Sequence, residues 1–260
     1  MLGCIIGLLM AIVPIYLLEV NGVKFLFKIL RALVKMLVFL GITGLCLYFV
    51  FKWNVVYANV LFVLLMMAFG SLMIVVKSRL GVGHYLLPTF AGVFLATVIV
   101  GICLILAVKG FDNVLDANML IPVSALLIWA IMETNAPAMR TYYMGLRHHG
   151  QLYEYLLGNG ATHRQAVRYF IKRAFECVSI PYIRRMALVV IGFSPIIVWS
   201  LLLYGVDVWT AIVFQAIVFI GTFCASVLSL YVSLLVAGKF SFDKYGNFKD
   251  NIKQEKEKEE

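Results

Sequence analysis

Charged residues are scarce in this sequence. Asp, Glu, Lys and Arg make up 13% of the 260 residues, whereas soluble domains contain about 25%. Hydrophobic residues reach 63%, well above the roughly 45–50% of soluble domains. This composition excludes a soluble globular domain, a disordered chain and a secreted scaffold built on disulfides.

Sequence motifs that bind metals or nucleotides are also missing. The five cysteines occur singly, without a CxxC or Cys/His cluster, so we expect small buried hydrophobes and no metal site. The phosphate-binding pattern GxxxxGK[ST] is absent, and this chain is therefore not expected to bind ATP or another cofactor. No Ser/His/Asp or Cys/His order indicates a catalytic residue. The sequence thus predicts a protein that is not itself an enzyme.

What the sequence does contain is a series of long apolar runs. A bilayer-spanning helix needs roughly 20 apolar residues, and only helices or closed barrels satisfy their backbone hydrogen bonds in lipid. These runs lack the alternation of barrel strands, so we predict an all-α integral membrane protein with seven transmembrane helices. The predicted spans are residues 2–18, 36–51, 53–76, 85–108, 117–139, 186–206 and 208–238.

Basic residues predict the orientation of these spans. With the N-terminus outside, 20 of the 22 Lys and Arg residues lie on the inside, and only Lys52 and Lys109 lie outside. This asymmetry follows the positive-inside rule and places the C-terminus in the cytoplasm. It also explains the net charge of +9 without a nucleic-acid partner. We therefore expect a transmembrane domain at 1–238 and a charged cytoplasmic tail at 239–260.

Residues 24–35 allow two interpretations. Their basic residues are spaced at i, i+4, i+7 and i+11, which places the charges on one helical face. The segment is then either an interfacial helix at anionic headgroups or an extension of the second span whose lysines reach toward water.

The inside loop at 140–185 is longer than the other loops and carries clear turn and cap signals. Gly-Asn-Gly at 158–160 indicates a tight turn with positive φ. Thr162 and Gln165 fit the N-cap and N3 positions of a capping box. We expect a helix at 142–157, the turn, and a second helix that begins after Thr162.

The second helix of this loop has an amphipathic pattern. Apolar residues recur at helical spacing from Ala166 to Val178, basic residues occupy the other face, and Pro181 is expected to end the helix. The loop then either lies on the lipid surface or docks into a groove of a soluble partner.

The turn also resembles a known family. Glu154, Leu157, Gly160-Ala161-Thr162 and Gln165-Ala166 match the E-x-x-L-x-x-G-A-T-x-x-Q-A stretch of the FetB/YbbM-type ABC transporter permeases, which are linked to bacterial iron export and plant aluminium tolerance. Ile121-Pro122, Pro195, Gly205-Val206-Asp207, Ala211-Ile212 and Gln215 match further landmarks in order. The resemblance covers the chain from the first span to the seventh.

The resemblance implies a function. The chain would be the permease subunit of an ABC transporter in the cell inner membrane, working as a homodimer with a separate soluble ATPase that binds ATP and Mg²⁺. It implies export of a metal ion or a small solute. In this family the turn contacts the ATPase, and the corresponding residues here are Glu154, Gly158, Gly160, Ala161, Thr162 and Gln165.

Three polar residues in predicted spans are candidates for a translocation path. Glu133 is the only carboxylate within an apolar span, and burying it in lipid costs roughly 2.5–3.5 kcal/mol. Glu133 lines a path near the cytoplasmic mouth, together with Asn135, or it lies at the headgroups. Gln215 begins a polar stripe on the last span that lines a path or bonds to a neighbouring helix.

Two other classes of function remain open from the residues alone. The first is a membrane scaffold that recruits a soluble partner through the loop at 140–185 without transporting anything. The second is an intramembrane enzyme that would use Glu133 with loop histidines, although no spacing supports such a site.

Overall fold

The structure, a computed structural model, describes residues 16, 26–53, 55–109, 116–187 and 196–241. Apart from residue 16, these residues form eight helices joined by short connections, which confirms the all-α prediction. The chain divides into two compact units, residues 1–54 and residues 55–260. The helices are α3 (Leu26–Trp53) in the first unit and, in the second, α4 (Val56–Lys77), α5 (Val82–Lys109), α6 (Ala117–His148), α7 (Gly150–Gly158), α8 (His163–Ala187), α9 (Ile196–Leu203) and α10 (Val208–Ser241).

Five of these helices are long and apolar enough to cross a bilayer: α3, α4, α5, α6 and α10. They correspond to the second, third, fourth, fifth and seventh predicted spans. The first predicted span, 2–18, lies outside the described residues apart from residue 16. The sixth, 186–206, is described only at its two ends. Seven spans and the orientation of the termini therefore stay predictions.

The N-terminal unit contains one described helix, α3. It is unbroken from Leu26 to Trp53 and includes Lys28, Arg31 and Lys35. Its apolar stretch, Phe27–Lys52, is 26 residues long. Residues 24–35 were predicted to form either an interfacial helix or an extension of the second span, and an extension requires this continuity. Lys24 lies outside the described residues.

In the second unit, α5 and α10 form the most extensive helix–helix contact. Every fourth residue of α10 is small and buried on this side: Gly221, Ala225, Ser229, Ser233 and Ala237. Gly92 of α5 lies directly against this stripe, because a Cβ atom at Gly92 would come within 2.5 Å of the Ser229 carbonyl oxygen. Small residues allow backbones to approach closely, which is how helices associate in lipid without a hydrophobic driving force.

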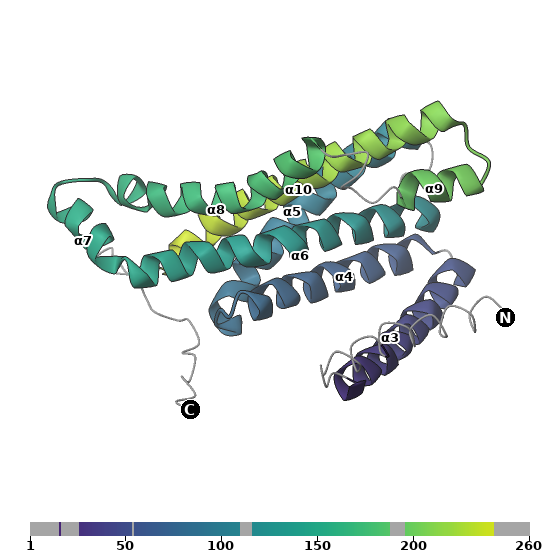
Figure 1. Cartoon of the computed structure of the whole chain (residues 1–260), viewed down its shortest axis with the longest axis horizontal. Helices are drawn as coiled ribbons and strands as arrows, with labels where there is room; N and C mark the ends of the chain where they lie inside the picture. The colour runs from purple at the N-terminus through teal and green to yellow at the C-terminus, as the bar shows by residue number, and fades with distance from the viewer. Residues whose placement is uncertain (1–15, 17–25, 54, 110–115, 188–195, 242–260) are drawn as a thin grey trace. The chain divides into compact units, whose positions relative to one another are not determined.

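Helix α6 is longer than the predicted span 117–139. It continues to His148, and neither Pro122 nor Pro137 interrupts it. The predicted loop at 140–185 therefore begins inside α6, and its first helix is divided between α6 and α7. Figure 1 shows α7 and its turn into α8 at one end of this unit, and α9 at the other.

The prediction that Pro181 ends the second loop helix is wrong, because α8 continues through Pro181 to Ala187. A proline removes one backbone hydrogen bond but does not prevent helical φ. The next residue, Tyr182, is buried. Its ring packs against Phe219 of α10 and its hydroxyl contacts the Ser226 hydroxyl of the same helix. We attribute the continuity of α8 to this packing, since tertiary contacts supply most of the stability of a helix.

Candidate partner-binding loop and the polar junction below it

The predicted turn is present between α7 and α8. The Ala161 N–H donates to the Leu156 carbonyl at 3.0 Å, and the Gly160 N–H donates to the Leu157 carbonyl at 3.0 Å. This pair of bonds is the Schellman motif, which needs a left-handed residue after the helix. Gly160 supplies it with φ +82. The positive φ predicted at this turn is confirmed.

The predicted cap of α8 is present in part. The Thr162 carbonyl accepts from the Gln165 and Ala166 N–H groups at 2.9 and 3.0 Å, and α8 begins at His163. The Thr162 N–H donates to Gln165 Oε1 at 2.8 Å, which is one half of a capping box. The Thr162 hydroxyl donates to the same Gln165 oxygen at 3.0 Å rather than capping a backbone N–H.

The six residues predicted to contact an ATPase lie together around this turn. All are exposed except Ala161, which is half-buried; they are Glu154, Gly158, Gly160, Ala161, Thr162 and Gln165. The turn itself has free space around it, because a Cβ atom at Gly158 or Gly160 would meet no atom within 4 Å. These six residues form the tip of the loop, and the tip is accessible.

The base of the loop is packed tightly against α6. Phe170 of α8 is buried and lies against Gly145, where a Cβ atom would be 3.1 Å from the ring. Tyr142 and Tyr143 of α6 pack edge to face at 4.9 Å, and Tyr143 contacts Tyr85 of α5 at 4.7 Å between ring centroids. The tip is thus exposed while its base is fixed.

Farther along α8, a polar junction joins α6, α8 and α10. With its amide nitrogen donating, Asn135 of α6 bonds to the Ser226 carbonyl at 3.1 Å. Its oxygen then accepts from the Ser229 hydroxyl at 3.1 Å and the Leu230 N–H at 3.2 Å. The Tyr182 hydroxyl of α8 lies 3.2 Å from the Ser226 hydroxyl. Each of these polar side chains is buried, so the junction fixes three helices at one level.

An ion pair adds a second link between α6 and α8. Arg185 Nη2 donates to Glu133 Oε1 at 2.9 Å, with the two side chains 34% and 39% exposed. Neither predicted role of Glu133, lining a path or lying at the headgroups, included this partner. The carboxylate is neutralised within the chain at the edge of the junction, on the opposite side of α6 from Asn135, because residues two apart on a helix differ by about 200°.

The three path candidates do not meet in one site. Glu133 pairs with α8, and Asn135 bonds to α10. Gln215, near the other end of α10, is 8% exposed, and its Oε1 atom has no hydrogen-bond partner among the described residues. The Asn135 contacts with Ser226 and Ser229 are bonds between neighbouring helices, which was one of the two interpretations of the polar stripe. The assignment of a path to these residues stays a prediction.

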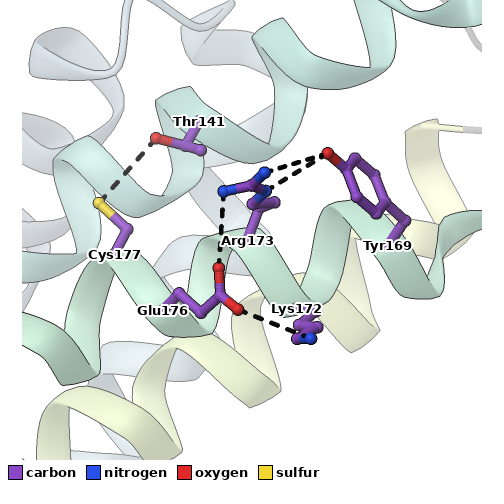
Figure 2. A network of polar contacts seen from close by, with 6 residues as sticks. All are labelled: Thr141, Tyr169, Lys172, Arg173, Glu176 and Cys177. Carbon is purple, nitrogen blue, oxygen red and sulfur yellow. Dashed lines mark hydrogen bonds and ion pairs between the residues drawn. The ribbon is translucent and has the colours of Figure 1, made fainter.

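The outer face of α8 carries its own polar contacts (Figure 2). Arg173 donates to the Tyr169 hydroxyl at 3.3 Å and pairs with Glu176 at 3.8 Å. The hydrogen bond to Tyr169 raises the pKa of Arg173 above its ordinary value. Lys172 also pairs with Glu176 at 3.8 Å, and Cys177 Sγ lies 3.9 Å from the Thr141 hydroxyl of α6.

Sequence reasoning missed Tyr182 and Arg185, because it ended the helix at Pro181. A signal was available, since Tyr182 follows Val178 and Phe175 at the helical spacings of four and seven and so continues their face. In the part of the chain that the structure describes, no three His, Cys, Asp or Glu residues are placed to hold a metal ion.

Comparison with known proteins gives one match. A family model described as Uncharacterised protein family (UPF0014) matches residues 1–242. Neither the search of curated proteins nor the search of solved structures finds a match.

Proposed function

The chain belongs to the UPF0014 family, which includes ABC-transporter permease-like proteins, and from this premise we propose that it is the membrane-spanning subunit of an ABC transporter. Its apolar helices support a multi-pass membrane protein. The observation that carries the proposal is the exposed α7–α8 tip on a helix whose far end is fixed to α6 and α10.

The geometry suggests how such a subunit would work. A soluble ATPase would bind the tip around Gly160, and its closure on ATP and Mg²⁺ would push on α8. Because α8 continues through Pro181 to Tyr182 and Arg185, a displacement of its start would reach α6 and α10 through the polar junction. Interfaces of this kind shift between discrete arrangements, which would alternate access across the bilayer.

The finer parts of the proposal rest on the resemblance of the loop sequence. They are a homodimer with two ATPase copies, residence in the cell inner membrane, and export of a metal ion or a small solute. Glu133, Asn135 and Gln215 would line the path only in an arrangement that brings them together.

The proposal is tested by the identity of the bound partner. We expect the chain, tagged and purified in mild detergent, to retain one soluble protein that contains GxxxxGK[ST] and hydrolyses ATP. Mass spectrometry identifies the protein, and phosphate release measures the activity. Retention of a partner without this motif would favour the scaffold alternative, and a hydrolytic activity of the chain alone would favour an enzyme.

The predicted topology is tested by labelling. In a background without the native cysteines, single cysteines at positions 150 and 245 should react only after the membrane is opened. Cysteines at positions 54 and 113 should react from outside, because the positive-inside bias places them there. Labelling of position 150 from outside would contradict the topology.

The ion pair of Glu133 gives a further prediction. Glu133→Gln should lower the thermal stability only slightly, since a partly exposed pair contributes about 0.2–1 kcal/mol. It should leave ATPase binding intact but reduce substrate-stimulated ATP hydrolysis, measured in reconstituted complexes at pH 5–8 with candidate metal cations in turn. Arg185→Gln is the matched control. An equal loss in both variants assigns the effect to the pair, and a loss in Glu133→Gln alone assigns it to cation binding.

A further inference from the structure

A groove lined by α8, α10 and one residue of α5, Val100, lies on the outside of the second unit. It has a volume of about 540 Å³, within the roughly 300–1,000 Å³ of ligand-sized pockets. Its lining is almost wholly apolar and includes Phe175, Ser179, Phe223, Val227, Leu228 and Tyr231. Most of these residues belong to α10, a helix long enough to span the bilayer, so the groove faces lipid rather than water.

Basic residues lie at one mouth of this groove. Lys172 and Arg168 precede Phe175 by three and seven residues, spacings that place them on the same face of α8. They lie about 4.5 and about 10.5 Å beyond Phe175 along the helix axis, at a rise of about 1.5 Å per residue. Both side chains are exposed, and Lys172 Nζ lies 3.8 Å from Glu176 Oε1.

Tyr231 marks the depth of this mouth. It is 52% exposed and lines the groove from α10, as Phe175 does from α8. Tyrosines concentrate where the hydrocarbon meets the headgroups. Under the proposed topology this is the cytoplasmic boundary, where anionic lipids attract basic residues.

We propose that this groove binds one anionic phospholipid, with an acyl chain against Phe175, Val227 and Tyr231 and the phosphate near Lys172 and Arg168. The charge at the mouth favours this occupant over an uncharged one. A second groove, about 380 Å³ between α4, α5 and α6, serves as an internal comparison. The site is independent of ATPase binding.

The test is native mass spectrometry of the full chain in neutral detergent with dioleoyl phosphatidylglycerol or phosphatidylcholine. We expect one retained phosphatidylglycerol and at least tenfold weaker retention of phosphatidylcholine. Arg168→Gln with Lys172→Gln should weaken phosphatidylglycerol at least tenfold, because each basic residue near an anionic surface is worth about fivefold in affinity. Arg184→Gln, which is exposed nine residues beyond Phe175 toward the other end of α8, is the matched control and should change retention less than twofold.

Two further variants locate the acyl chain. Val227→Trp fills the groove without changing charge and should abolish retention, whereas Val98→Trp in the other groove should not. Equal retention of both lipids, or full retention in Val227→Trp, would overturn the proposal. It would also be overturned if glycerol phosphate protects the chain from heat as well as the lipid does, or if Val227→Trp instead converts a dimer to a monomer without a change in bound lipid.

Discussion

Replacing Gly160 with leucine should abolish binding of the ATPase while the chain still inserts and accumulates. Gly160 has φ +82, and the turn is closed by two hydrogen bonds that the Gly160 and Ala161 N–H groups donate. A leucine in this conformation costs about 1–2 kcal/mol, so the turn would open and the start of α8 would shift. Its side chain would also project from the exposed tip. We expect the amount of co-purified ATPase to fall at least tenfold, measured against the amount of the chain.

Three controls separate binding from folding. Gly160→Asn should keep most of the binding, since asparagine tolerates the left-handed region. Gly150→Ala, in the same loop but outside the six predicted contact residues, should be neutral, because a Cβ atom there meets nothing within 4 Å and no positive φ is needed. Gly205→Leu imposes the same strain at the turn after α9, where φ is +89, and should leave the ATPase bound. Unchanged binding in Gly160→Leu would show that this turn does not contact the partner.

Gly92→Ala should destabilise the second unit more than other single-methyl additions to it. The new Cβ atom would overlap the Ser233 hydroxyl and lie 2.5 Å from the Ser229 carbonyl oxygen. A backbone atom cannot rotate away, so α5 and α10 must separate along their small-residue stripe. Overpacking of this kind costs about 1–3 kcal/mol, and for a unit of this size each kcal/mol lowers Tm by about 2–4 °C.

Gly101→Ala, on the same helix, is the matched control for this variant. The added Cβ atom would have only an ordinary contact, 3.6 Å to Leu127 Cδ1. Alanine also has a higher helix propensity than glycine, so Tm should stay the same or rise. Thermal unfolding in one detergent, followed by fluorescence-detected size exclusion, compares the two variants. Equal Tm values would mean that α5 and α10 are not packed as closely as the structure places them.

Local features were predictable from the sequence because their causes are local. The apolar runs that become α4, α5 and α10 follow from the cost of unpaired backbone in lipid. The turn at Gly160 and the cap at Thr162 depend on residues a few positions apart, so the pattern contains every partner. The amphipathic face from Ala166 to Val178 likewise depends only on helical period, and the structure buries five of its residues: Ala166, Val167, Phe170, Ala174 and Val178.

The length of α8 and the partners of the polar residues in the spans depend on residues that are distant in the chain, so only the tertiary structure determined them. Whether Pro181 ends a helix depended on the packing of Tyr182 against α10. The α10 residue that Tyr182 contacts, Ser226, is 44 residues away in the sequence. Glu133 and Arg185 are 52 residues apart, so no periodicity could pair them. A polar side chain in a span must find a partner or a path, and the sequence shows that need for Glu133 and Asn135. Only the packing of α6 between α8 and α10 determined that both needs are met within the chain.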